Sequence, residues 1–174
     1  MTTTTLDDGK TVTTLLAALL VVFGTVVGNT AKAYFPKNWT MASYLGTAMF
    51  LGGWVYTAWL LGDQRTDEDM YVIYSSAAVI ALSSAYMKYM MDNGKKYHFS
   101  FPVLYSVAWL VFGFYISKHM DDEKQYLGLL SSLLVIVAMV FVLPYQRRKK
   151  VVDGPALVLY TLAWANVVFI NSSR

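Results

Sequence analysis

Long apolar runs alternate with short polar breaks along this chain. The runs contain roughly 17 to 24 residues, which is the length that an α-helix needs to cross about 30 Å of hydrocarbon. The segment GLLSSLLVIVAMVFVLP, from Gly128 to Pro144, is apolar on all sides, whereas a soluble amphipathic helix keeps one polar face. The pattern predicts membrane-spanning helices over residues 12–34, 40–62, 69–92, 98–118, 125–145 and 154–171.

The connections between these ranges are short and rich in charged residues, glycine and proline. None of them is long enough to separate two domains, so we expect residues 1–174 to form a single integral membrane domain. The predicted fold class is all-α, a polytopic bundle of six transmembrane helices arranged as three hairpins.

Lysine and arginine are concentrated in every second connection. Lys37 lies in the first connection, Lys95 and Lys96 lie in the third, and an Arg-Arg-Lys-Lys run occupies positions 147–150 in the fifth. Acidic residues predominate near the N-terminus and in the connections at 63–69 and 121–123. Because positively charged loops are retained on the cytoplasmic side of a membrane, this asymmetry predicts an N-out, C-out orientation.

Two similar phrases occur in the fourth and sixth predicted helices: LYSVAW at 104–109 and LYTLAW at 159–164. Each follows a serine-pair segment in the preceding helix, SSAAVIAL at 75–82 or SSLLVIVA at 131–138. These matches favour a tandem hairpin repeat over residues 69–118 and 125–171, and YTAW at 56–59 suggests a diverged third copy. The alternative is chance similarity between helices that draw on a small set of apolar residues.

Aromatic and neutral polar residues are the candidate functional positions inside the predicted helices. Tyr105 and Trp109, like Tyr160 and Trp164, are four residues apart and share a helix face. The neutral polar candidates are Ser75, Ser76, Ser83, Ser131, Ser132 and Asn166. These side chains either bond within the helix bundle or line a pathway for a small neutral solute.

Residue types needed for catalysis or metal binding are scarce in the predicted spans. The chain has no cysteine, and we find no ionisable residue near the middle of a span, where proton- or ion-coupled proteins place such groups. The predicted topology separates His98 from His119 by the full membrane, so they cannot share a metal. We therefore predict a non-enzymatic protein with no catalytic residue, cofactor or metal.

Partners are predicted from the loop charges and from the packing features. Arg147, Arg148, Lys149 and Lys150 are expected to contact anionic lipid headgroups. The basic residues do not form a groove-lining face, which argues against nucleic-acid binding. We expect a multi-pass integral membrane protein that is a structural or accessory subunit, assembled with other membrane subunits or with copies of itself. The alternative function is a channel or facilitator for a small neutral solute.

Overall fold

A computed structural model describes residues 8–63, 65–118, 120, 124–142 and 154–173. These residues are helical apart from short connections, and no strand occurs among them. The helices are α1 (Asp8–Tyr34), α2 (Trp39–Gly62), α3 (Asp67–Asp92), α4 (Ser100–Ser117), α5 (Tyr126–Ile136), the π-helical η2 (Val137–Val142) that continues α5, and α7 (Gly154–Ser172). The expected all-helical class is confirmed for the described residues, and each of the six predicted ranges overlaps one helical segment.

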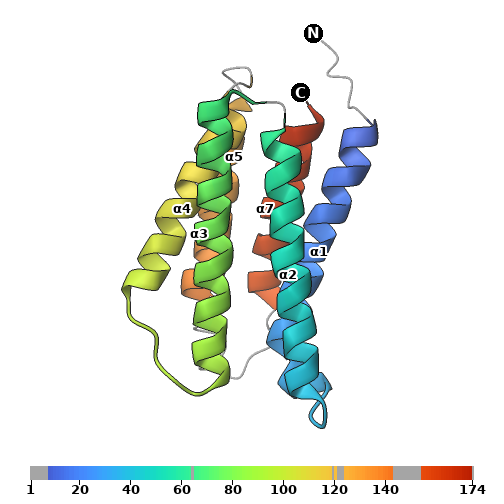
Figure 1. The fold of residues 1–174 in the computed structure, drawn as a ribbon, viewed down its shortest axis with the longest axis vertical. Coiled ribbons are helices and arrows are strands. Elements are labelled where there is room, and N and C mark those ends of the chain that lie inside the picture. The colour runs from blue at the N-terminus through green and yellow to red at the C-terminus, as the bar shows by residue number, and fades with distance from the viewer. Residues whose placement is uncertain (1–7, 64, 119, 121–123, 143–153, 174) are drawn as a thin grey trace.

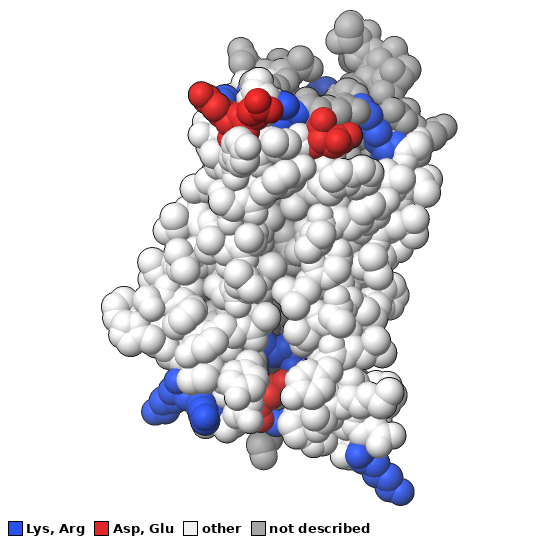
Figure 2. All heavy atoms as spheres, viewed as in Figure 1, with Lys and Arg blue, Asp and Glu red and all other residues white. Residues whose placement is uncertain are grey.

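Five of these helices, α1, α2, α3, α4 and α7, are long and apolar enough to cross a membrane. The helix formed by α5 and η2 is equally apolar in character but shorter, running from Tyr126 to Val142. Charged side chains gather at the two ends of the molecule, and the face drawn in Figure 2 shows a broad band between them that is nearly free of charge. This distribution matches the polar, apolar, polar profile of a lipid bilayer.

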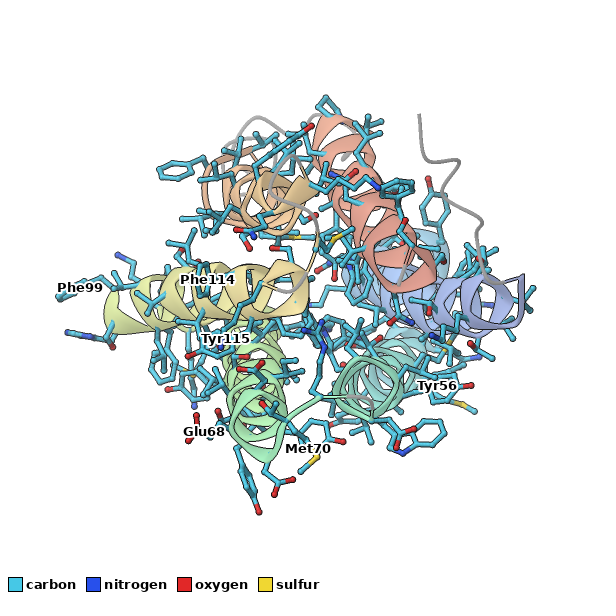
Figure 3. The ribbon with its side chains drawn as sticks, turned by 90° about the horizontal axis from the view of Figure 1, so that it is seen from above. Tyr56, Glu68, Met70, Phe99, Phe114 and Tyr115 are labelled. Atoms are coloured by element: carbon cyan, nitrogen blue, oxygen red, sulfur yellow. The ribbon has the colours of Figure 1, made fainter. Side chains whose placement is uncertain are left out.

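The helices form a closed ring in chain order. Each one contacts the next along the chain, and α7 returns to contact α1 (Figure 3). The start of α1 and the end of α7 lie at the same end of the bundle (Figure 1). We call this the terminal end, and the opposite end, where Lys32 and Lys88 lie, the lysine end. A buried hydrogen bond of 2.7 Å from the Asn171 side chain to Thr14 Oγ1 joins α7 to α1 near the terminal end.

Local sequence explains where α3 begins and ends. Thr66 is its N-cap, and the Thr66 side chain accepts a 3.4 Å hydrogen bond from the Asp69 backbone N–H. Acidic residues fill the first turn, where the positive end of the helix dipole stabilises their negative charge. At the other end, Gly94 has a φ of 67° and the Lys95 N–H bonds to the Met90 carbonyl at 2.8 Å. This left-handed glycine turns the chain out of the helix.

Glycines allow the closest helix contacts. Gly24 and Gly28 of α1 lie directly against Gly46 of α2, while Gly113 of α4 lies against Gly128 of α5. In both places a Cβ atom added to a glycine would collide with backbone atoms of the facing helix. Small residues of this kind let helices approach in lipid, where the hydrophobic effect does not drive helices together.

Candidate functional site at the bundle axis

Three tryptophans meet at the axis of the ring. Trp54 of α2, Trp109 of α4 and Trp164 of α7 are at most 2% exposed. Their ring centroids are 5.2 Å apart for Trp54–Trp109 and Trp54–Trp164 and 6.1 Å apart for Trp109–Trp164, all in T-shaped contact. Phe112 adds T-shaped contacts to Trp54 at 5.3 Å and to Trp109 at 5.6 Å. We call these four residues the aromatic plug.

The plug corrects the alignment that the sequence suggested for the first hairpin. The phrase YTAW pointed to Trp59, but Trp59 is 52% exposed on the outside of α2. Trp54 is the residue that joins Trp109 and Trp164, and the three tryptophans are spaced 55 residues apart. Phe50, Tyr105 and Tyr160, each four residues before a tryptophan, keep the same spacing. A search for aromatic pairs at a fixed interval finds this register, whereas a search for similar phrases misses it.

Buried positions elsewhere follow the same interval of 55 residues. Thr57, Phe112 and Val167 are all buried one turn beyond the tryptophans, and Gly62, Ser117 and Ser172 are all buried at the terminal ends of α2, α4 and α7. The helices α2, α4 and α7 therefore present equivalent positions to the axis.

Four buried polar atoms around the plug have no hydrogen-bond partner among the described residues. They are the indole nitrogens of Trp54, Trp109 and Trp164 and the hydroxyl oxygen of Thr57. Leaving such a group without a partner costs about 1–3 kcal/mol. The T-shaped contacts bring positive ring edges against negative ring faces, which recovers part of that cost.

The hydroxyl groups of the candidate serines donate hydrogen bonds to backbone carbonyls. Ser76 and Ser83 donate to carbonyls four residues earlier in α3, at 2.7 and 2.6 Å, and Ser131 does the same in α5 at 2.9 Å. Ser75 is exposed and bonds to Val72 of its own helix. Ser132 also reaches across to α4, where it donates to the Trp109 carbonyl. Asn166 is half-buried on α7. These serines therefore do not form a polar stripe, because their hydroxyls turn back to the helices.

A cavity of about 110 Å³ lies between the plug and the lysine end. Phe50, Tyr105 and Tyr160 line it on the plug side, where their rings contact the three tryptophans. Lining residues come from α1, α2, α3, α4, α7 and the π-helical segment η2, which contributes Met139. Segments of π-helix occur frequently at functional sites. We call this space the lysine-end cavity.

Lys88 lines this cavity and is held by a polar cluster that the sequence did not reveal. Its ammonium donates to the Asp92 carboxylate, one turn further along α3, and to Ser43 of α2. Ser43 donates to the same carboxylate at 2.9 Å. Lys32 of α1 donates to the Asp92 backbone carbonyl at 2.8 Å and lies 4.4 Å from the Trp39 ring centre. The cluster ties α1, α2 and α3 together, and the charge of Lys88 is neutralised by Asp92. In Figure 2, blue and red atoms meet in the groove towards this end.

A second space, of about 200 Å³, opens at the terminal end. Leu61, Arg65 and Asn171 are among the residues that line it. Leu61 lies 11 residues after Phe50 on α2, which corresponds to about 16 Å along the helix. The aromatic plug and the layers next to it fill that distance, so packed side chains separate the two spaces.

Arg65, in the connection between α2 and α3, closes the terminal end of α4. Its guanidinium donates to the carbonyls of Tyr115 at 3.2 Å and Ile116 at 2.8 Å. These carbonyls belong to the last turn of α4, where a positive charge is favoured by the helix dipole. Burial lowers the pKa of Arg65 to about 10, against an opposing influence from Asp69, so the side chain is still charged at neutral pH.

Replacing Arg65 by glutamine is expected to destabilise the protein by about 1.5–3 kcal/mol, because two charge-assisted bonds to the end of α4 are lost. Lys37→Gln is the control: Lys37 is solvent-exposed in the connection between α1 and α2, so its loss should cost less. Equilibrium unfolding in mixed detergent micelles measures the free energy of unfolding of both variants. An equal loss in the two variants would contradict the assigned role of Arg65.

Several predicted positions lie outside the described residues, including Arg147, Arg148, Lys149, Lys150 and His119. Within the described part of the chain, no group of three His, Cys, Asp or Glu side chains is placed to hold a metal ion. Comparisons with protein-family models, curated proteins and solved structures find no significant match to this chain.

Proposed function

We propose that this chain is a non-enzymatic, multi-pass integral membrane protein that acts as a structural or accessory subunit of a larger membrane assembly. The observation that carries the proposal is the filled axis of the ring. At the level of the plug the large side chains are at most 2% exposed and pack ring against ring. A bundle packed in this way favours stable placement of helices over passage of a solute.

We also propose that the six helical segments span the membrane as three hairpins, with both chain ends on the outer side. Support comes from the closed ring and from the position of Lys32, Lys88, Lys95 and Lys96 near the same end of the bundle. The interval of 55 residues between buried positions supports three copies of one hairpin unit, and so extends the repeat expected over 69–118 and 125–171 to the first hairpin.

The partners in this proposal are lipid, including anionic headgroups, and other membrane subunits or copies of the same chain. Large apolar side chains cover the outside of the ring, among them Met41, Val55 and Leu82, each more than 60% exposed. Such a surface suits either acyl chains or the face of another membrane helix. The basic run at 147–150 remains the proposed headgroup contact.

One observation favours a channel or facilitator for a small neutral solute as a second candidate. The aromatic plug lies between the two spaces, and its neighbourhood contains the four buried polar atoms without partners. In a rearranged bundle, these groups would be available to a solute moving along the axis. Conduction would require the plug to open.

The substitution Thr57→Val separates the two candidates. It keeps the shape of the side chain and removes a hydroxyl oxygen that is buried without a partner. For a structural subunit, we expect stability to be unchanged or to rise by about 1 kcal/mol, because an unpaired polar group is removed. We also expect proteoliposomes to pass water, urea and glycerol no faster than protein-free liposomes.

Thr161→Val is the matched control, because Thr161 is exposed and bonds to the Leu157 carbonyl of its own helix. Native mass spectrometry after gentle extraction from the native membrane should find the chain with another subunit or with further copies. Solute flux that Thr57→Val reduces and Thr161→Val does not would replace the structural proposal with the channel.

A further inference from the structure

The lysine-end cavity is a partly open space that the side chains of the bundle leave unfilled. Its volume of about 110 Å³ is of the order of an engineered apolar cavity of about 150 Å³ that binds benzene. A ligand of that size has a single ring and few other atoms. Larger molecules such as nucleotides or phospholipids do not fit within it.

The walls favour an aromatic occupant. Phe50, Tyr105 and Tyr160 provide ring surfaces on the plug side, and Met87, Met91 and Met139 line other parts of the cavity. Methionine is polarisable, adapts its shape to a ligand, and makes favourable contacts with aromatic rings. The aromatic rings and thioether groups together form an apolar lining that suits a small aromatic molecule better than a sugar or a polyol.

A few polar groups converge in the same space. The residues with a hydroxyl group that line the cavity include Thr25, Ser84, Tyr105 and Tyr160. Apolar walls with a few hydroxyl groups are typical of sites that orient a ligand through one hydrogen-bonding group.

Charge complementarity argues for a neutral ligand. Among the described lining residues, Lys88 is the one Lys, Arg, Asp or Glu side chain, and it is already paired with Asp92 and Ser43. A charged ligand would lose its hydration and find no free countercharge, which is unfavourable.

We propose that the lysine-end cavity binds a small uncharged aromatic molecule with one hydrogen-bonding group, of the size of phenol. The site lies on the lysine side of the plug and rests on neither proposed role of the protein. Binding without flux is compatible with a structural subunit, and binding with flux is compatible with a channel.

The test uses 4-fluorophenol and fluorine NMR on the full chain in lipid nanodiscs, with protein-free nanodiscs as the reference for partition into lipid. We expect saturable binding that unlabelled phenol displaces, and no saturable binding of 4-fluorobenzoate, which has the same ring and a negative charge. Uptake equal to that of empty nanodiscs, as expected if the cavity holds only water, would overturn the proposal. Equal binding of the benzoate would also overturn it.

Two alanine substitutions on α3 locate the site. Ala85 lines the lysine-end cavity, whereas Ala78 lines a separate groove between α2 and α3. We expect Ala85→Phe to fill the cavity and abolish saturable binding, and Ala78→Phe to leave the affinity unchanged. Equal effects would mean that the probe binds elsewhere.

Tyr105→Phe provides an independent readout if Ala85→Phe does not fold. Removing this hydroxyl should weaken 4-fluorophenol binding by about two- to tenfold, the range expected for one hydrogen bond. Fluorobenzene, which has no hydroxyl, should bind the variant and the wild-type protein equally. A variant that loses both probes to the same extent would contradict a hydrogen bond between Tyr105 and the ligand.

Discussion

Replacing Trp109 by alanine is expected to lower the free energy of unfolding by about 3–5 kcal/mol, the range for truncating a buried Trp or Phe. Trp109 is fully buried and contacts Trp54, Phe112 and Trp164 in the plug as well as Tyr105. The substitution removes four ring contacts and leaves a cavity at the axis that neighbouring helices can fill only in part. Denaturation in mixed detergent micelles, followed by circular dichroism, measures this decrease in the free energy of unfolding.

Trp59→Ala is the control for this experiment. Trp59 lies on α2, as Trp54 does, but it is 52% exposed, and its ring stacks on Tyr56 at 5.9 Å. Its removal should change stability by about 0.5 kcal/mol or less, the usual range for surface positions. If the equivalent positions act alike, Trp54→Ala and Trp164→Ala should resemble Trp109→Ala. A loss for Trp59→Ala as large as that for Trp109→Ala would contradict the central role of the plug.

Gly46→Ala is expected to destabilise the protein by about 1–3 kcal/mol, because an added methyl group overpacks a closed contact. A Cβ atom at this position would lie 2.7 Å from Gly28 Cα and 2.8 Å from the Gly24 carbonyl oxygen. Both neighbours are backbone atoms, so the clash is relieved only when α1 and α2 move apart. Reduced unfolding stability and faster hydrogen exchange in α1 would record that separation.

Gly52→Ala is the matched control on the same helix. A Cβ atom added to Gly52 meets nothing within 4 Å. Because alanine is favoured over glycine in a helix by about 1 kcal/mol, this variant should be as stable as the wild type or slightly more so. If both substitutions were neutral, the α1–α2 contact would be looser than the structure has it.

The helical class and the approximate helix positions could be predicted because they depend on local properties. A run of apolar residues long enough to span hydrocarbon must satisfy its backbone hydrogen bonds internally, and a helix does this without help from other segments. The polar breaks then set the helix ends, as Thr66 and Gly94 do for α3. The π-helical geometry of Val137–Val142 carried no such signal and was not predicted.

The candidate site was predicted in part. Tyr105, Trp109, Tyr160 and Trp164 were singled out from their spacing, and they do meet at the axis. For the serines, the sequence left two interpretations open: hydrogen bonding within the helix bundle, or lining a pathway for a solute. In the structure, their hydroxyl groups donate to backbone carbonyls. Trp54 was missed, because the phrase around Trp59 resembles the later copies more closely than the residues around Trp54 do.

The sequence by itself determined the number and character of the apolar segments, the charge at their ends and two of the three axial aromatic pairs. Tertiary structure alone decided that α7 closes the ring against α1, that Trp54 completes the plug, and that Ser43 of α2 joins the Lys88–Asp92 pair of α3. The physical reason is that apolar helices in lipid have no outward-facing polar stripe to mark their inner side. Which faces meet is then set by the fit of small and large side chains between helices that are distant in sequence. Hydrogen bonds between such helices contribute as well, as the bond from Asn171 to Thr14 does.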